Sequence, residues 1–240
     1  MDDYPLALVT GSAHRLGRAF ALTLARQGYA IVLHYYRSKA EADSTAEEIR
    51  SLNVPVYPIR ANLTKPADIN SLFLKLDSVG HRLKVLVNSA GTIKHDDLQK
   101  ISLQDWDAML DINLRATLLV TQQAVSRMAE GGVIVNITEA GVGKIWTGFP
   151  AYLVSKVGLE TLTRLQAKTY APNIRVNAIA PGPVLPPAAM EAGEWNKLVN
   201  RLPLKHPAAL EEISLALEFL LKNNSVTGQT IVVDGGYSLI

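Results

Sequence analysis

Tyr152 and Lys156 are two side chains whose types and spacing are suited to proton transfer. They stand four residues apart in a segment of helical periodicity, so both project from one face of the expected helix and can meet. For a tyrosine to act as an acid near neutral pH, its pKa must fall from about 10 to about 7, which requires roughly 4 kcal/mol. A lysine cation about 4 Å away supplies about that much at an effective dielectric of about 20. The pair therefore predicts a general acid.

The placement of this pair matters, because 8 tyrosines and 24 basic residues give about one such pair by chance. It follows the apolar run Val133–Ile137 and a loop that carries Glu139. An ionised carboxylate about 8 Å from Tyr152 would cancel about 2 kcal/mol of the stabilisation that Lys156 gives to the ionised tyrosine. Glu139 should therefore be neutral or matched by a positive partner, such as a substrate with a basic ring nitrogen. A surface or salt-bridged glutamate is the alternative.

The elements that must position these side chains alternate between short apolar runs and longer stretches of helical period. This alternation is typical of βαβ units and a mostly parallel sheet with helices on both faces. The chain shows no linker or repeat, so a single α/β domain over residues 1–240 is expected. The expected strands are Pro5–Thr10, Ala30–Tyr35, Val54–Ile59, Val85–Asn88, Val133–Ile137, Ile174–Ala180 and Thr230–Val233. The expected helices are Leu16–Gln27, Lys39–Leu52, Pro66–Asp77, Leu103–Met128, Tyr152–Tyr170 and Ala208–Lys222.

A turn with two glycines joins the first expected strand to the first helix. Gly11 can form the tight turn, and Gly17 allows the helix to approach the sheet closely. The backbone N–H groups at the start of such a helix suit a pyrophosphate. A plain strand-to-helix turn that binds nothing is the alternative.

The end of the second expected strand bears on which dinucleotide would bind. An NAD-binding protein places an acidic residue there for the ribose 2′-hydroxyl, whereas this chain continues with Tyr36, Arg37 and Ser38. Arg37, Ser38 and Arg15 offer cations and a hydroxyl to a 2′-phosphate. Loss of one such contact should cost about 1.5–3 kcal/mol. The pattern predicts NADPH rather than NADH, unless Arg37 is only a solvated surface cation.

Further candidates follow the third and fourth expected strands, because ligands of α/β sheets bind at the carboxyl ends of the strands. Asn62 is a candidate for contact with the adenine, and Asn88, Ala90 and Gly91 are candidates for the wall behind the cofactor. Either asparagine could instead only stabilise a turn.

Four prolines stand within Pro181–Pro187, after the sixth expected strand. Proline restricts φ, so we expect a stiff loop over the substrate side of the sheet. Leu185, Met190 and Trp195 would line the substrate pocket, with Trp146 and Phe149 on the opposite wall. A packed surface connection or a subunit contact is the alternative for the loop, and ordinary core packing is the alternative for the two aromatic residues.

Taken together, these motifs resemble those of the short-chain dehydrogenase/reductase family over essentially the whole chain. The resemblance rests on Thr10-Gly11…Gly17, Asn88-Ser89-Ala90-Gly91, Asn113, Tyr152-x-x-x-Lys156, Asn177…Pro181-Gly182 and Asp234-Gly235-Gly236. It implies a Rossmann domain with a seven-stranded parallel, doubly wound sheet and an NAD(P)(H) cofactor. In that family the tyrosine donates a proton as hydride arrives, the lysine binds the nicotinamide ribose and lowers the tyrosine pKa, and an asparagine holds a water. Tyr152, Lys156 and Asn113 match those positions.

The cofactor contacts that we predict come from the glycine turn, the ends of the strands and the Tyr/Lys pair. They are Gly11, Arg15, Leu16, Gly17, Tyr36, Arg37, Ser38, Asn62, Asn88, Ala90, Gly91, Tyr152, Lys156, Pro181 and Gly182.

Two departures from the family pattern resemble its pteridine-reductase branch. Arg15 replaces a third glycine, and Glu139 replaces the serine thirteen residues before the tyrosine. That branch has an arginine in the turn, an aspartate at the serine position and a His-Tyr-x-Arg-Ser segment, which residues 34–38 match. Ile93 stands where the branch tends to carry an aromatic residue that stacks on the pterin. The substrate contacts that we predict are Ile93, Glu139, Trp146, Phe149, Leu185 and Trp195.

The resulting interpretation is an NADPH-dependent reductase of the C=N bond of a dihydropteridine or dihydrofolate. Glu139 would pass a proton to the ring nitrogen while hydride reaches the adjacent carbon. A carbonyl or 3-oxoacyl-thioester reductase and a catalytically silent NADPH-binding regulator are the alternatives.

Composition argues against several other classes of protein. The 24 basic and 22 acidic side chains form no polybasic block, which disfavours a nucleic-acid or membrane-surface binder. Without cysteine there is no disulfide or thiolate site, and the histidines lack metal-ligand spacing. Met1–Pro5 lacks the basic start of a signal peptide, and no apolar stretch approaches the roughly 20 residues that span a bilayer. We expect a cytoplasmic protein with a small-molecule substrate and, by resemblance, a homo-oligomer, either a dimer or a tetramer.

Overall fold

Seven parallel strands form the central sheet of the computed structural model, which describes residues 4–187 and 190–240. Their order is β3-β2-β1-β4-β5-β6-β7, so the strand order reverses between β1 and β4. In α/β sheets the ligand crevice opens at such a reversal, outside the carboxyl ends of the strands. The strands are β1 (Leu6–Thr10), β2 (Ala30–Tyr35), β3 (Val56–Arg60), β4 (Leu83–Asn88), β5 (Met128–Ile137), β6 (Ile174–Pro181) and β7 (Thr230–Val233).

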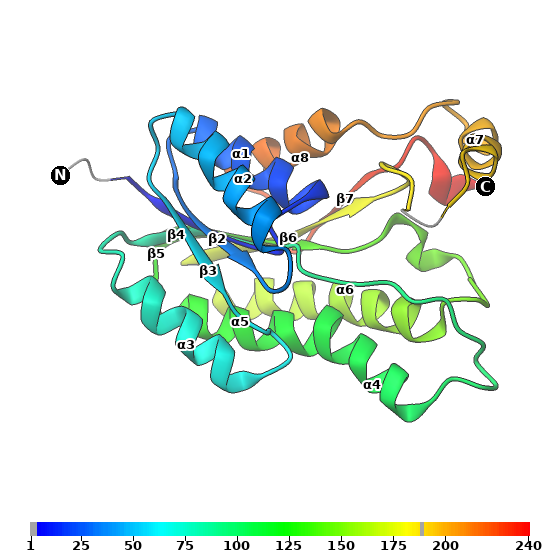
Figure 1. Ribbon diagram of the computed structural model, residues 1–240, viewed down its shortest axis with the longest axis horizontal. Helices are drawn as coiled ribbons and strands as arrows, with labels where there is room; N and C mark the ends of the chain where they lie inside the picture. Colours follow the sequence, from blue (N-terminus) through cyan, green and yellow to red (C-terminus); the bar gives the residue numbers. More distant parts are fainter. Residues whose placement is uncertain (1–3, 188–189) are drawn as a thin grey trace.

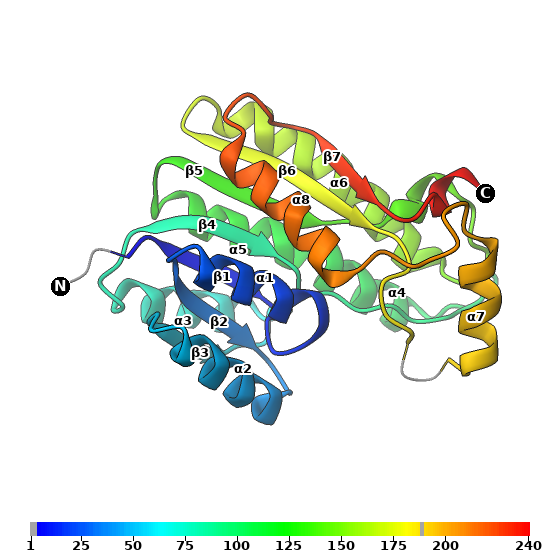
Figure 2. The same ribbon diagram turned by 90° about the horizontal axis from the view of Figure 1, so that it is seen from above.

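Helices cover both faces of this sheet (Figure 1). One face carries α1, α2 and α8 and the other carries α3, α4, α5 and α6, whereas α7 stands beyond the carboxyl edge, next to the C-terminus (Figures 1 and 2). The helices are α1 (Arg15–Arg26), α2 (Lys39–Ser51), α3 (Pro66–Asp77), α4 (Leu103–Leu110), α5 (Ala116–Val125), α6 (Pro150–Tyr170), α7 (Ala192–Arg201) and α8 (Leu210–Lys222). A π-helical segment (Asp111–Arg115) joins α4 to α5, and 3-10 turns form at Ala140–Gly143 and Tyr237–Leu239.

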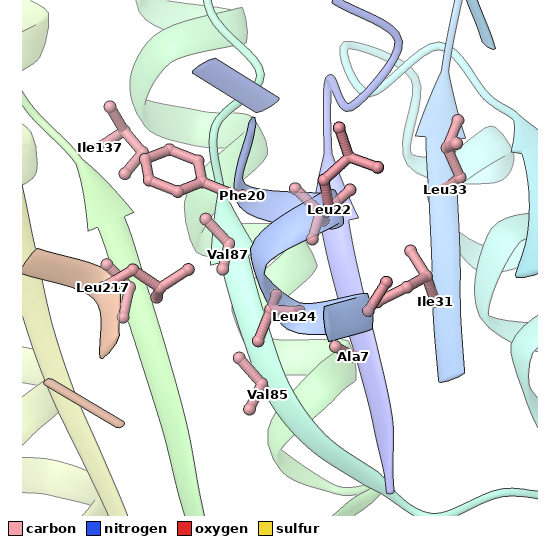
Figure 3. Close-up of a cluster of buried hydrophobic side chains, with 14 of the residues drawn as sticks. Ala7, Phe20, Leu22, Leu24, Ile31, Leu33, Val85, Val87, Ile137 and Leu217 are labelled. Carbon is pink, nitrogen blue, oxygen red and sulfur yellow. The ribbon is translucent and has the colours of Figure 1, made fainter. Parts of the chain in front are cut away.

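Fully buried side chains fix α1 and α8 to the strands (Figure 3). Phe20 and Leu24 of α1 and Leu217 of α8 belong to one cluster with Val85 and Val87 of β4. Burial of each large side chain contributes roughly 1.5–3 kcal/mol. The helix that follows the glycine turn is therefore fixed to the strands from whose ends the crevice opens.

The predicted architecture, an α/β fold with one seven-stranded parallel sheet and helices on both faces, is confirmed. One predicted helix needs correction. The segment Leu103–Met128 is not one α-helix, because a π-helical segment interrupts it and Met128 already pairs with Leu83 as the start of β5. The proline-rich segment from Gly182 to Pro187 is a loop, as predicted, and helix α7 further along the chain was not predicted.

The other predicted elements lie within a few residues of their expected ends. Of the N-terminal segment Met1–Pro5, residues 1–3 lie outside the described residues. In the part of the chain that the structure describes, no helix is both long and apolar enough to cross a membrane.

Candidate active site

Most of the predicted site residues gather around a cavity of about 910 Å³ at the carboxyl edge of the sheet. Those that line the cavity are Gly11, Arg15, Leu16, Gly17, Tyr36, Arg37, Ser38, Asn62, Ala90, Gly91, Ile93, Glu139, Trp146, Tyr152, Lys156, Pro181, Gly182, Leu185 and Trp195. Asn88, Asn113 and Phe149 were also predicted, but they do not line it.

A buried histidine closes the glycine turn. Gly11 has φ +66°, a conformation that favours glycine, and a Cβ on Gly17 would lie 2.1 Å from the Gly11 carbonyl oxygen. The Gly11 amide donates to His34 Nδ1 at 3.0 Å, so the ring proton is on Nε2, which lies 3.1 Å from the Ala61 carbonyl oxygen. Burial lowers the pKa of His34 to about 4, and the bond to Ala61 opposes that shift. The neutral ring thus holds the turn between two strand ends.

The start of α1 fits the pyrophosphate of a dinucleotide. The Arg18 amide donates to the His14 carbonyl oxygen at 3.2 Å, so the amides before it have no acceptor within the helix. His14 provides no side-chain cap, and the cavity reaches this first turn. Free amides and the positive end of the helix dipole attract phosphate groups. This end of the cavity can therefore hold the cofactor phosphates.

Arg15 points toward the proline-rich segment. It has φ +52°, at the position where the family pattern has glycine. Its guanidinium donates to the carbonyl oxygens of Leu185 at 3.0 Å and Pro186 at 3.2 Å. Arg15 also lines the cavity, and its predicted contact with a 2′-phosphate beside Arg37 stays a prediction. Arg15 links the glycine turn to the substrate loop, a contact between distant segments that spacing along the chain does not reveal.

A second cationic group lies at the end of β2. The guanidinium carbons of Arg37 and Arg60 lie 5.2 and 5.8 Å from the centroid of the Tyr36 ring. Arg60 also donates to the Tyr36 carbonyl oxygen at 3.1 Å, and Ser38 is the N-cap residue of α2. Guanidinium groups and a helix start offer a suitable environment for a 2′-phosphate. Arg60 was not predicted, because it becomes a neighbour only through the pairing of β2 with β3.

The two predicted asparagines differ in where their side chains point. Asn62 lines the cavity, and its Oδ1 accepts hydrogen bonds from the amide and hydroxyl of Thr64. Asn88 is 4% exposed, and its Nδ2 donates to Asn136 Oδ1 at 2.9 Å, which joins β4 to β5. The prediction for the Asn88 side chain is corrected: it fixes the sheet, and the backbone after it, at Ala90, faces the cavity.

Tyr152, Lys156 and Glu139 meet inside the cavity. The Tyr152 hydroxyl donates to Glu139 Oε2 at 2.9 Å, and the Gly141 amide donates to Glu139 Oε1 at 3.2 Å. Lys156 Nζ donates to the carbonyl oxygen of Ile137, at the end of β5, at 2.8 Å. Glu139 is therefore a direct partner of the tyrosine and lies much closer than the separation of about 8 Å assumed for a through-space effect.

The charges of this group act on one another. Burial raises the pKa of Tyr152, and the Glu139 carboxylate raises it further. Burial also raises the pKa of Glu139, opposed by its hydrogen bonds and by Lys156, and it lowers the pKa of Lys156 to about 8, opposed by Glu139. The expected lowering of the Tyr152 pKa by Lys156 is thus absent in this arrangement. Tyr152 can release its proton only when Glu139 is neutralised by a proton or a positive partner.

Asn113 lies behind the cavity in the π-helical segment, a feature often found at functional sites. Its Oδ1 accepts from the Thr92 amide at 2.9 Å, and its Nδ2 donates to Ser155 Oγ at 3.2 Å. The Asn113 side chain therefore positions the loop after β4 against α6 without entering the cavity. Its role in holding a water stays a prediction.

Aromatic side chains form the substrate end of the cavity. The Trp146 ring is parallel to Tyr152 within 10° at 6.5 Å between centroids, and it meets Tyr237 at 5.9 Å. Trp146 can lie there because residue 141 is glycine, since a Cβ on Gly141 would lie 2.2 Å from the indole. Phe149 contacts Trp146 at 6.0 Å without lining the cavity, so its predicted contact with substrate is corrected.

Tyr237 is the main substrate-side residue that the sequence did not reveal. The two glycines before it have φ +63° and φ +85° and form a turn. Asp234 stabilises that turn by accepting from the amides of Gly236 at 2.8 Å and Ser238 at 2.7 Å. The Asp-Gly-Gly run indicated a turn, but it did not show that the next residue reaches Trp146.

Two sequence comparisons bear on the family of the chain. The family model described as "Enoyl-(Acyl carrier protein) reductase" matches residues 11–238. The 3-oxoacyl-[acyl-carrier-protein] reductase FabG of Staphylococcus epidermidis is 33% identical over 238 residues, which cover 96% of this chain and 97% of that protein. The chain belongs to the short-chain dehydrogenase/reductase family. This short-chain dehydrogenase/reductase is therefore a nicotinamide-dependent oxidoreductase, as predicted. FabG of Thermotoga maritima is 35% identical over 239 residues, covering 96% of each chain.

Solved structures of the family share the fold over the whole chain. FolM alternative dihydrofolate reductase 1 from Brucella suis, in complex with NADP, has a TM-score of 0.93 and 31% identity, and the match covers 100% of this chain and 97% of that one. A blue fluorescent protein from a metagenomic library, in complex with NADPH, has a TM-score of 0.91 and 29% identity, with 97% of each chain covered. The predicted use of a nicotinamide cofactor agrees with both complexes.

Proposed function

We propose that this short-chain dehydrogenase/reductase is an NADPH-dependent reductase of the C=N bond of a dihydropteridine or dihydrofolate. The hydrogen bond of 2.9 Å from the Tyr152 hydroxyl to the Glu139 carboxylate carries the proposal. A carboxylate beside the tyrosine opposes reduction of a neutral ketone, because it disfavours the phenolate that such a reaction leaves. A substrate with a basic ring nitrogen supplies the positive charge that balances Glu139.

The roles proposed for the side chains follow from their positions. A bound nicotinamide cofactor supplies hydride in this chemistry. Glu139, whose pKa burial raises, would deliver a proton to the ring nitrogen as the adjacent carbon accepts hydride. Tyr152 keeps its proton and orients the carboxyl group of Glu139 through their hydrogen bond, and solvent returns a proton to Glu139 after each turnover. Trp146, parallel to Tyr152, offers a flat surface for a planar bicyclic ring.

NADPH is proposed over NADH because of the cations at the end of β2. Arg37 lines the cavity beside Tyr36, and Arg60 supports that backbone. The NADP complex of the FolM relative and the NADPH complex of the blue fluorescent protein are consistent with this choice. The glycine turn and the start of α1 would bind the pyrophosphate.

A 3-oxoacyl-thioester reductase is the second candidate. The FabG relatives at 33% and 35% identity favour it, since the match covers nearly the whole chain. Under this alternative, Tyr152 and Lys156 act as a simple acid pair and Glu139 has no part in the chemistry.

Oxidation of NADPH by the purified protein tests these candidates. Dihydropteridines and dihydrofolate are offered in parallel with 3-oxoacyl thioesters and simple diketones, and kcat/KM is compared across the panel. Turnover of the pteridines well above that of the carbonyl compounds is the expected result. Turnover confined to the carbonyl compounds would reject pteridine reduction in favour of the second candidate.

We further propose that the enzyme works in the cytoplasm as a homo-oligomer, a dimer or a tetramer. Apolar side chains are exposed on α6, at Val154, Val157 and Leu165, and on α8, at Leu215 and Phe219. Exposed apolar faces of this kind are suited to contacts between copies of a chain. Light scattering with size-exclusion chromatography should give a molar mass of two or four times 26.1 kDa, and a mass of 26.1 kDa would contradict the assembly.

A further inference from the structure

Two cations, Lys144 and Arg201, lie just beyond the residues that line the substrate end of the cavity. The Lys144 ammonium lies 3.6 Å from the centroid of the Tyr237 ring, and Tyr237 lines the cavity. Arg201 is the last residue of α7, the helix whose Trp195 and Leu198 also line the cavity. None of the ion pairs formed within residues 4–187 and 190–240 includes either cation.

The charges of the two cations lie close enough to act on the same groups. Burial lowers the pKa of Lys144, the Arg201 charge lowers it further, and Asp234 opposes the shift. Burial and Glu139 raise the pKa of Tyr237, and Arg201 opposes them. Asp234 is already occupied, because its two carboxylate oxygens accept from backbone amides of the C-terminal turn. Lys144 and Arg201 therefore lie near Tyr237 together with two carboxylates, Asp234 and Glu139, whose oxygens already accept hydrogen bonds within the protein.

Packing fixes the end of α7 beside the turn that carries Tyr237 (Figures 1 and 2). Leu202 is 0% exposed, and the Leu204 amide donates to the Gly235 carbonyl oxygen at 3.1 Å. A Cβ on Gly236 would lie 2.7 Å from Pro203, which shows how closely the two segments approach. Arg201 is therefore attached to a rigid part of the site.

Trp146 links Tyr237, on whose ring Lys144 lies, to the catalytic candidate Tyr152. Its ring is parallel to Tyr152 on one side of the site and meets Tyr237 on the other. A substrate whose reduced ring lies at Tyr152 thus extends along Trp146 toward Lys144 and Arg201. Charge-assisted hydrogen bonds from an ammonium and a guanidinium favour a carboxylate at that end, whereas a neutral tail would gain no such bond from the two cations.

We propose that Lys144 and Arg201 bind a carboxylate on the end of the substrate remote from the reduced ring. The preferred substrate is then a dihydropteridine with an anionic tail, as in dihydrofolate, rather than a dihydropterin with a neutral side chain. This inference rests on the proposed pteridine reduction and adds the chemistry of the tail.

The test compares dihydrofolate with dihydrobiopterin, whose side chain is neutral. Lys144→Gln and Arg201→Gln should each lower kcat/KM for dihydrofolate about tenfold, the loss expected for one charge-assisted contact. The loss should appear in KM with kcat kept, which is the signature of binding that is equal in ground and transition states. Turnover of dihydrobiopterin should stay nearly unchanged.

Three controls separate recognition of charge from damage to the fold. Lys75→Gln removes an exposed cation from α3, far from the cavity, and should leave kcat/KM unchanged for both substrates. Lys144→Arg and Arg201→Lys keep the charge and should recover most of the lost affinity. Added salt should raise the KM for dihydrofolate more than the KM for dihydrobiopterin.

The outcomes distinguish failure of the inference from failure of the proposed function. Suppose that the wild-type enzyme reduces both pteridines. If kcat/KM of the two glutamine variants then falls equally for both substrates, or does not fall, the anionic-tail inference is rejected and pteridine reduction stands. If wild-type enzyme reduces neither pteridine, both proposals are rejected together.

Discussion

The cofactor end and the substrate end of the cavity are held by different kinds of contact. At the cofactor end, Gly17 packs on the Gly11 carbonyl and His34 binds the Gly11 amide, so the contacts fix the backbone itself. At the substrate end, Trp146 lies on Gly141 and against Tyr237, so side chains from separate loops define the surface. Glu139 and Tyr152 lie between the two ends.

This difference determines how the shape of each end responds to amino-acid substitutions. A turn fixed by backbone contacts keeps its shape when exposed side chains change, which suits a cofactor that stays the same. A surface made by loop side chains changes with each substitution, which suits selection among substrates. The same family fold can thereby keep its hydride donor and change the compound that it reduces.

Loss of the Tyr152 hydroxyl should have the largest effect and should separate the two ends. Tyr152→Phe removes the donor to Glu139, so we expect kcat to fall about 10²- to 10⁴-fold. Binding of NADPH, measured by fluorescence titration, should change little because the glycine turn is untouched. A variant that keeps most of its kcat would remove Tyr152 from the mechanism.

Alanine substitution of one glycine at each end should have different effects. At the cofactor end it should cause a large loss of stability, and at the substrate end it should mainly change substrate binding. A Cβ on Gly17 meets the Gly11 carbonyl oxygen at 2.1 Å, so Gly17→Ala should lower the free energy of unfolding by about 3 kcal/mol. A Cβ on Gly141 meets the indole of Trp146 at 2.2 Å, and that side chain can move. Gly141→Ala should therefore raise the substrate KM and shift Trp fluorescence with a smaller loss of stability.

Urea unfolding monitored by circular dichroism gives the comparison directly. Gly143→Ala is the matched control, because nothing lies within 4 Å of a Cβ there. A loss of stability for Gly141→Ala as large as that for Gly17→Ala would show that both ends are equally rigid.

Acid should weaken the cofactor end through His34. Its pKa is about 4 in the folded chain against an ordinary value near 6.5, so the unfolded chain takes up a proton that the folded chain refuses between these values. The free energy of unfolding should accordingly fall as the pH drops from about 6.5 to about 4, by about 3 kcal/mol in total. His34→Asn should flatten this slope, whereas the exposed control His206→Asn should keep it; an unchanged slope in His34→Asn would exclude the histidine as its source.

Removal of the Arg37 charge should have a smaller effect, confined to one cofactor. Arg37→Gln should weaken NADPH binding about ten- to hundredfold and leave NADH binding unchanged. Arg60→Gln should weaken it less, because Arg60 supports the Tyr36 backbone and does not line the cavity. Equal losses of NADPH and NADH affinity in Arg37→Gln would contradict a 2′-phosphate contact.

The same contrast explains what the sequence could predict. The glycine turn, the Tyr152/Lys156 pair and the position of Glu139 follow from local spacing and from the ends of apolar strands. The contact of Arg15 with Leu185, the inward direction of Asn88 and the contact of Trp146 with Tyr237 join segments that are distant in the sequence. Spacing along the chain carries no signal for such meetings, since tertiary packing decides them.

The most direct test of the central claim replaces Glu139 and compares two kinds of substrate. Glu139→Ser restores the residue of the common family pattern, and kcat/KM is measured for a dihydropteridine and for a simple ketone, with Glu139→Asp as the conservative control. We expect Glu139→Ser to lose pteridine reduction and to keep or gain ketone reduction, while Glu139→Asp keeps much of the pteridine activity. Unchanged pteridine reduction in Glu139→Ser would contradict the role of Glu139 as the proton partner of the ring nitrogen.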